Sequence, residues 1–137
     1  MVQATPFRIT ETADLDAAGT DNQITIAPGE EKTVAEYEAQ DPRRQMFLLA
    51  LGATDRGSTD YQLYVDDDRK LSTRSPLGEV NQPFSFLREL GFVYPAEQII
   101  EYRLRRDSSA GSSADYVARM YVTEEMPFVV NRQRGDV

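Results

Sequence analysis

Apolar and polar residues alternate along much of this chain with the period of two that a half-buried β-strand requires. In the stretch 60–66, Tyr61, Leu63 and Val65 face one way and the residues between them face the other. The stretch 98–125 repeats the alternation in two arms, with apolar positions at Ile100, Tyr102, Leu104, Ala118, Met120 and Val122. The pattern predicts strands that turn one face toward a core.

Turn residues mark where these strands end. Pro28 and Gly29 fit the two central positions of a type II turn, in which Gly supplies the positive φ, and they predict a hairpin over 23–38. The second arm of that hairpin could instead be helical, because Val34 and Tyr37 are three residues apart.

A continuous apolar run and a flexible tip add two further elements. Met46–Leu51 has the length and composition of a central strand covered on both faces, and the turn-rich residues 54–60 send the chain back. The Ser- and Gly-rich tip 107–115 predicts that the two arms of 98–125 form a second hairpin, with arginines on its solvent face.

A different spacing appears in the irregular stretch 71–98. Phe84, Leu87 and Leu90 are three residues apart, Pro83 precedes them and Gly91 follows. This spacing predicts one short helix with Pro in its first turn and a Gly stop, which plugs one end of a sandwich.

About eight short strands and one small helix predict an all-β fold, an antiparallel β-sandwich of jelly-roll or Greek-key topology. Residues 1–22 are polar and predict an extended N-terminal arm that can end in one edge strand. Residues 23–126 form the sandwich domain, and residues 127–137 form a C-terminal tail. Both arms are candidates for reaching a neighbouring molecule.

The composition excludes several classes of protein. A chain of 137 residues fits one domain, it opens without a signal peptide, and its longest apolar run, Met46–Ala53, is too short to cross a bilayer. Cys and His are both absent, so the chain has no disulfide, no thiolate or imidazole ligand for zinc, and no Ser-His or Cys-His nucleophile. We expect a protein that is not an enzyme, although carboxylate chemistry stays open.

The charge is acidic and rich in Arg. The chain has 23 Asp and Glu against 15 Lys and Arg, a net charge of -8, and only Lys32 and Lys70 are lysines. Carboxylates combined with weakly hydrated guanidinium groups are typical of a protein that works in concentrated salt. A GC-rich genome and an ordinary acidic protein would account for the same composition.

The charge is also uneven along the chain, with -9 on residues 1–68 and +1 on residues 69–137. An Arg-bearing face of one copy could therefore pack on an acidic face of another, or the two halves could pair within one molecule. No extended basic patch with interleaved aromatic residues occurs, so nucleic acid is not an expected partner.

Three consecutive carboxylates, Asp66, Asp67 and Asp68, are the candidate metal site, for Ca²⁺ or Mg²⁺. Neighbouring side chains on an extended strand point apart, and Arg69 and Lys70 follow directly. The alternative is that the triplet closes a hairpin and solvates its turn, because Asp is a common turn residue.

The other candidate sites lie on the predicted strands. Arg103, Arg105 and Arg119 could bind a partner, or pair across strands with Glu101 and solvent. A glycosidase-like pair would join Glu101 to one of Glu97, Asp107 or Glu124. The tripeptide 134–136 spells an integrin motif, to which we assign no role.

Tyrosines offer a possible carbohydrate surface. Exposed Tyr64 and Tyr94 could bind sugar beside acidic loop residues, whereas Tyr61 and Tyr102 belong to the core because they alternate with aliphatic residues.

The stretches ITIAPGEEKTV and YQLYVDDDRKLSTRSPLG, with the two arms and the acidic composition, resemble small virion proteins of halophilic archaeal tailed viruses. The resemblance covers residues 23–123 and is to capsid decoration or turret proteins. It implies a β-sandwich that carries no catalytic residues and binds copies of itself and other virion proteins, in a virion assembled in the host cytoplasm. A carbohydrate- or host-surface-binding sandwich is the alternative function.

Overall fold

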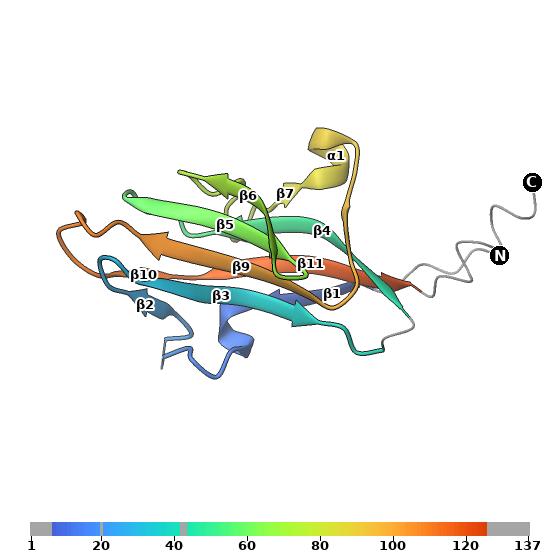
Figure 1. Cartoon of the computed structure of the whole chain (residues 1–137), viewed down its shortest axis with the longest axis horizontal. Coiled ribbons are helices and arrows are strands. Elements are labelled where there is room, and N and C mark those ends of the chain that lie inside the picture. The colour runs from blue at the N-terminus through green and yellow to red at the C-terminus, as the bar shows by residue number, and fades with distance from the viewer. Residues whose placement is uncertain (1–6, 20, 42–43, 126–137) are drawn as a thin grey trace, which may run out of the picture.

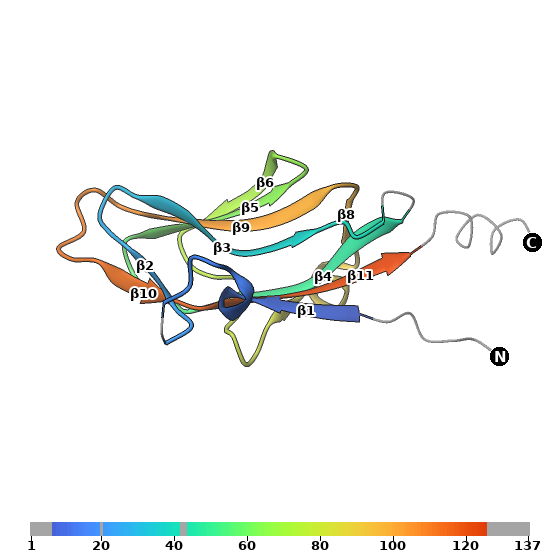
Figure 2. The ribbon, with the colours of Figure 1, turned by 90° about the horizontal axis from the view of Figure 1, so that it is seen from below.

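Two antiparallel sheets, stacked face to face, make up most of the computed structural model, which describes residues 7–19, 21–41 and 44–125 (Figures 1 and 2). Sheet A has the strand order β1-β11-β4-β7, with β8 also paired to β4, and sheet C has the order β3-β9-β5-β6. Strands β2 and β10 pair as the small sheet B. The antiparallel β-sandwich predicted from the sequence is confirmed.

The strands have the following bounds. Sheet A consists of β1 (Phe7–Glu11), β4 (Gln45–Ala53), β7 (Phe84–Ser85), β8 (Tyr94–Ala96) and β11 (Ala118–Glu125). Sheet C consists of β3 (Glu31–Glu38), β5 (Thr59–Val65), β6 (Asp68–Thr73) and β9 (Ile99–Arg106). Sheet B consists of β2 (Ile24–Ile26) and β10 (Ala114–Tyr116).

The order in which the chain visits the sheets is that of a jelly roll. After β1 and β2 it passes to β3 in sheet C, returns to sheet A as β4, and crosses again to β5 and β6. Strands β7 and β8 share one edge of sheet A, β9 lies inside sheet C, and β10 and β11 complete the other layer. With β7 and β8 counted as one edge position of sheet A, this strand order is that of an eight-stranded jelly roll, which is built from two Greek keys.

The two hairpins predicted at 23–38 and 98–125 are wrong. The turn at Pro28-Gly29 forms, since Glu30 N donates to Ala27 O at 3.0 Å and Gly29 has φ +85°. However, β2 pairs with β10 and β3 pairs with β9, so this turn carries the chain from one layer to the other. The alternative helix at 31–38 does not form either.

Strands β9 and β11 likewise belong to different sheets, as do β4 and β5. A local turn signal shows where the chain bends, whereas the pairing of a strand depends on residues far away in the sequence. The apolar face of each arm was nevertheless predicted correctly, because Tyr102, Leu104, Met120 and Val122 are all buried in the core.

One predicted hairpin is confirmed, and it contains the Asp triplet. Val65 pairs with Asp68, and the two residues between them, Asp66 and Asp67, have φ +53° and +66°. Two consecutive residues with positive φ are the mark of a type I′ hairpin turn, which Asp tolerates better than most residues.

The short helix α1 (Phe86–Leu90) forms, but its expected apolar face is wrong. Ser85 Oγ accepts a hydrogen bond from Arg88 N at the start of the helix, and Gly91, with φ +80°, provides the predicted stop. Phe86 is the residue buried in the core, whereas Leu87 and Leu90 are 62% and 51% exposed. A helix of one turn can direct only one residue inward, and Phe86 takes that position.

The N-terminal segment belongs to the sandwich from Phe7 onward, as the edge strand β1 and the 3-10 turn η1 (Thr12–Asp14). Thr12 is fully buried, donates to Val34 O at 2.6 Å and accepts from Ala118 N at 2.8 Å, and thereby ties sheet A to sheet C. The remainder of the predicted arm, 1–6, and the predicted tail, 127–137, lie outside the described residues.

Candidate functional site: the outer face of sheet A

The outward side of sheet A is apolar at its centre. In register across the strands, Ile9 lies opposite Tyr121 and Tyr121 lies opposite Ala50. The ladder between β4 and β11 skips Leu49, a β-bulge that adds one more apolar side chain on this side. We call this surface face A and define it by Ile9, Phe47, Leu49, Ala50 and Tyr121.

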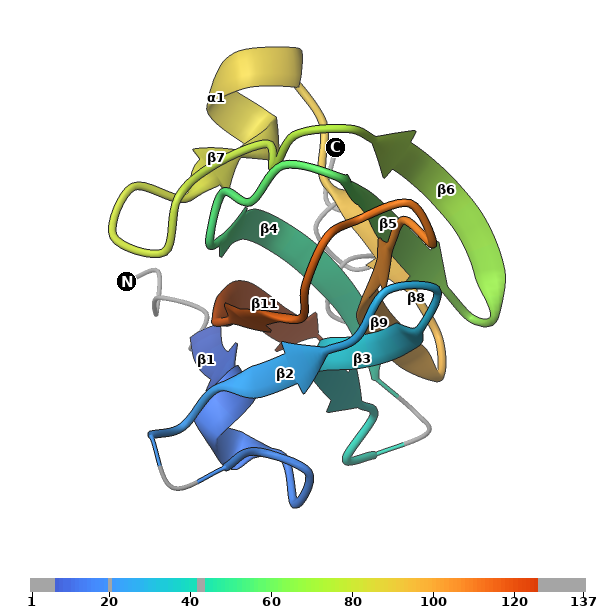
Figure 3. The same ribbon diagram turned by 90° about the vertical axis from the view of Figure 1, so that its left-hand side faces the viewer.

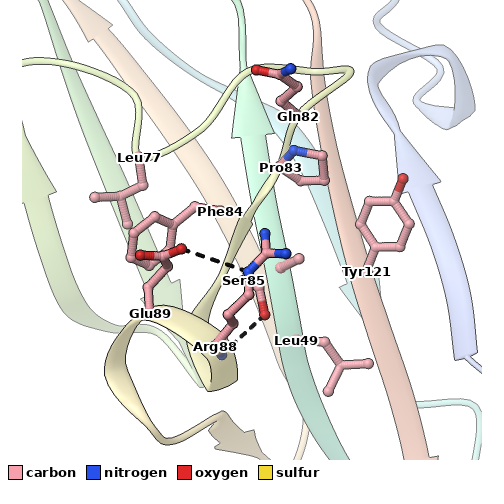
Figure 4. Close-up of a pocket in the computed structure, with 10 residues that line it drawn as sticks. Leu49, Leu77, Gln82, Pro83, Phe84, Ser85, Arg88, Glu89 and Tyr121 are labelled. Atoms are coloured by element: carbon pink, nitrogen blue, oxygen red, sulfur yellow. Dashed lines mark hydrogen bonds and ion pairs between the residues drawn. The ribbon is translucent and has the colours of Figure 1, made fainter.

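A groove of about 820 Å³ runs along face A, between its strands and the segment that contains β7 and α1 (Figure 4). Tyr121 and Leu49 form its floor and one side, and Pro83 and Gln82 lie above them in the view of Figure 4. The other lining residues are Ala50, Leu77, Phe84, Ser85, Arg88 and Glu89. Apolar side chains with a few polar groups at the rim are the usual lining of a binding groove.

The wall of this groove is held by close backbone packing. Gly52 of β4 lies directly beneath the 74–83 loop, and a Cβ atom at this position would lie 2.2 Å from Glu79 O. Gly78, within this loop, is packed as closely, because a Cβ atom added at Gly78 would lie 2.3 Å from Phe84 N. The loop therefore sits on face A only because both residues lack a side chain.

Three large apolar side chains project beside the groove. Leu87, Leu90 and Phe92 are 62%, 51% and 44% exposed. The first two belong to α1 and the third follows it closely, and α1 stands out from both sheets (Figure 3). We call these three residues the α1 knob. The base of the knob is rigid, since Phe86 and Phe92 each make an edge-to-face contact with Tyr94, at 5.1 Å and 5.2 Å between ring centroids.

The charges on face A and its groove cancel. Arg119 Nε lies 2.7 Å from Glu11 Oε1, and Arg88 Nε lies 3.7 Å from Glu89 Oε1. Among the residues that the structure describes, Arg88 and Glu89 are the only charged ones that line the groove. An apolar, electrically neutral surface is thus present on a protein whose net charge is -8.

The outward side of sheet C has the opposite character. Arg103 Nη2 donates to Glu101 Oε1 at 2.7 Å, and its guanidinium lies 3.9 Å from the centroid of the Tyr64 ring. Gln62 donates to Glu31 at 2.8 Å and accepts from Arg69 at 3.2 Å. We call this surface face C; its polar groups are bound to one another.

The predicted metal residues have other partners. Asp66 accepts hydrogen bonds from the backbone N–H groups of Glu97, Gln98 and Ile99, at 2.7 to 3.0 Å. Burial acts to raise the pKa of Asp66, but these three donors outweigh it and hold the pKa below its ordinary value. The carboxylate therefore anchors the β5-β6 turn to the start of β9.

The other two carboxylates of the triplet point elsewhere. Asp68 pairs with Lys70 at 2.9 Å, and Asp67 lies 3.7 Å from Arg103. Within the described residues, no group of three or more Asp or Glu side chains is arranged to hold a metal ion.

The two predicted sugar-binding tyrosines do not share a surface. Tyr64 lies on face C beneath the guanidinium of Arg103. Tyr94 pairs in register with the buried Leu48, so it faces the interior of the sandwich, where it packs against the core. Neither ring offers the free, exposed face that stacking on a sugar requires.

The predicted arginine patch is divided between the two sheets. Arg103 and Arg105 belong to β9 in sheet C, where Arg105 lies opposite Glu31 and Asp60 in register. Arg119 belongs to β11, on the outer side of sheet A, where it binds Glu11. The patch was predicted on the assumption that β9 and β11 pair, and it does not exist as one surface.

Carboxylates also come together on sheet C, in a pair that the sequence did not indicate. Glu36 lies opposite Glu101 in register, and burial, followed by the charges of Glu101 and Glu38, raises the pKa of Glu36. Glu101 is itself bound to Arg103. The predicted partners are spread out: Glu97 precedes β9, Asp107 follows it, and Glu124 is in sheet A.

Sequence reasoning missed the groove and the α1 knob. The signal available was the run FSFLRELGF, in which five apolar residues exceed what one helical turn can bury. None of the helices within the described residues has the length and apolar character needed to span a membrane.

Comparisons with known proteins give no match, since neither a family model nor a curated protein sequence aligns with this chain. Jelly rolls serve unrelated purposes, among them viral capsids and lectins, so the fold alone does not assign a function. The function must be inferred from the chemistry of the surface.

Proposed function

We propose that this protein is a non-enzymatic structural subunit that assembles with copies of itself through face A. Exposed apolar patches of this kind mark interaction sites on soluble proteins. The assembly we propose is the virion of a halophilic tailed virus, in which the protein is a capsid decoration or turret subunit in contact with other virion proteins.

The observation that carries the proposal is the difference between the two outer faces. Face C satisfies its polar groups with one another, as a solvated surface does. Face A and the α1 knob leave Ile9, Leu87, Leu90 and Phe92 between 44% and 62% exposed. Covering such side chains removes apolar area from water and stabilises an assembly by about 25 cal/mol for each Å².

The virion assignment is supported by two further features. Jelly rolls are a common architecture of capsid proteins, and the sequence resembles small virion proteins of halophilic viruses. With a net charge of -8, copies of the chain repel one another in dilute buffer, and this repulsion is screened over about 3 Å in 1 M salt. Assembly is therefore expected to need concentrated salt.

A carbohydrate-binding module is the second candidate, and it would use the groove. Tyr121 offers an aromatic ring there, and Gln82 and Ser85 offer amide and hydroxyl groups. Binding on a glycan array that disappears in Tyr121→Ala would favour this candidate.

Light scattering after size-exclusion chromatography, at about 0.1 M and about 3 M salt, tests the proposed function because surface charge is felt at the first and screened at the second. We expect a defined oligomer at high salt and a monomer at low salt. Tyr121→Glu should stay monomeric at both, and Ser72→Glu, an exposed position on β6 in sheet C, should behave as wild type. A folded wild-type monomer at both salt concentrations contradicts the proposal.

A further inference from the structure

We propose that the occupant of the groove is the α1 knob of a second copy, and that the two copies exchange knobs across a two-fold axis. This inference rests on the proposed function and names the contact through which assembly begins. Knob and groove would be complementary parts of one self-recognising surface.

The core holds the knob in a fixed direction. Phe86 anchors α1 in the core, and its contacts with Phe84 and Tyr94, at 5.4 Å and 5.1 Å between centroids, fix the direction of the helix. Leu87 and Leu90 are consequently held outward on a rigid support. A preorganised apolar projection loses little side-chain entropy when it is buried, which favours binding.

The knob and the groove lie side by side. Arg88 and Glu89 line the groove, whereas Leu87 and Leu90 of the same helix stand exposed beside it. A knob next to its own groove cannot fill it, but a second copy turned by 180° brings its knob to the first groove and receives the first knob in return. Two-fold interfaces have this reciprocal form, in which residue i contacts j and j contacts i.

Charge permits a second copy to dock at the groove, although the molecules repel one another elsewhere. Two molecules with a net charge of -8 repel one another over most of their surfaces. The groove is neutral, because one Arg and one Glu, Arg88 and Glu89, are its only charged lining residues within the described part of the chain. Across a two-fold axis near α1, Arg88 of each copy approaches Glu89 of the other, so the charges that border the knob become complementary.

The absence of cysteine from the sequence provides a direct proximity test, since any thiol introduced is the only one present. Leu90→Cys places a thiol on the knob, and Ser72→Cys places one on the exposed side of β6 as the matched control. With a short bismaleimide and about 10 μM protein at 3 M salt, we expect Leu90→Cys to form covalent dimers about 100-fold faster than Ser72→Cys, because the effective concentration within a complex is in the millimolar range.

A mixing experiment then tests the reciprocal contact. Arg88→Glu alone leaves two acidic residues beside the knob, and Glu89→Arg alone leaves two basic ones. At the lowest salt concentration at which wild type dimerises, where like charges in contact are least screened, each variant should dimerise about tenfold more weakly than wild type. Mixed in equal amounts, the two variants should form a heterodimer with near wild-type affinity. Recovery on mixing cannot come from the Arg88–Glu89 pair within one chain, at 3.7 Å, because neither chain has that pair.

The results separate this inference from the proposed function. An oligomer at high salt without preferential cross-linking of Leu90→Cys, or without recovery on mixing, overturns the inference and leaves assembly through another part of face A. Another occupant of the groove, such as residues 126–137 or a different protein, would give that result. A wild-type monomer at both salt concentrations overturns both.

Discussion

The two outer faces of the sandwich arise from the same alternation of side chains and differ in what they do with their exposed groups. On face C the alternation directs Gln62, Tyr64, Glu101 and Arg103 outward, and each is bound to another residue of that face. On face A it directs Ile9 and Tyr121 outward, with a groove beside them.

This difference shows that an alternating pattern identifies a strand but does not predict whether its outer side faces solvent or binds a partner. Polar residues that satisfy one another need nothing more than water, and they add specificity to the sheet rather than a binding site. Apolar residues left outward reduce solubility unless something covers them. Four substitutions test this contrast between the two faces.

Gly52→Ala should have the largest effect, because it removes the wall of the groove on face A. The added Cβ would lie 2.2 Å from Glu79 O, so the 74–83 loop must lift from the sheet. We expect a loss of roughly 2 to 3 kcal/mol in the free energy of unfolding, measured with urea. Gly57→Ala is the control, since nothing lies within 4 Å of that position. Equal stability of the two variants would contradict the close packing.

Asp66→Ala should cost about 2 kcal/mol, because it removes a charged acceptor of three backbone hydrogen bonds and places Ala at φ +53°. Asp66→Asn is the matched control, since it keeps one acceptor oxygen and tolerates positive φ.

The same carboxylate predicts a dependence on pH. Its pKa is lowered in the folded protein, so its contribution is complete above the ordinary value of about 4 and is lost as pH falls through the folded value. The stability difference between wild type and Asp66→Asn should therefore shrink below about pH 4. A constant difference down to about pH 2 would show that the charge of Asp66 does not stabilise the turn.

Arg103→Ala tests face C and should cost about 1 kcal/mol, because it removes an ion pair and a cation-π contact from a partly exposed position. Glu101 would then face Glu36 without its partner, and the pKa of Glu36, already raised by burial, should rise further. Arg103→Lys keeps the charge without the planar guanidinium and should lose less. The mass at high salt should not change in either variant; a lower mass would assign assembly to face C.

Features that depend on residues close together in the sequence were predictable, and features that depend on residues far apart were not. The β5-β6 turn at Asp66-Asp67, the turn at Gly29 and the buried faces of β5, β9 and β11 were predictable, because each depends on residues within one turn or one strand. The pairing of β9 with β3 and β5 was not, since its partners lie far away along the chain.

The arrangement of the candidate site residues in space was not predictable for the same reason. Placing Arg103 and Arg119 on one surface required β9 and β11 to pair, and the exposed state of Tyr94 depended on its unseen pairing with Leu48. Face A is assembled from three strands that are distant in the sequence, so no single stretch of the sequence predicts it.

Ile9→Thr should have the smallest effect on stability and still separate the two faces. Ile9 is 48% exposed on the edge strand β1, and Thr keeps the branched Cβ that suits a strand, so the free energy of unfolding should change by no more than about 0.5 kcal/mol. If face A is covered in the assembly, the loss of apolar area should weaken association about fivefold, which sedimentation over a dilution series at high salt would measure. Thr33→Val, a partly buried position on β3 beside Arg103, makes the reverse exchange on face C and should leave association unchanged. An unchanged dissociation constant for Ile9→Thr would restrict the interface to the groove and the α1 knob, because β1 would then remain in water on both sides of the equilibrium.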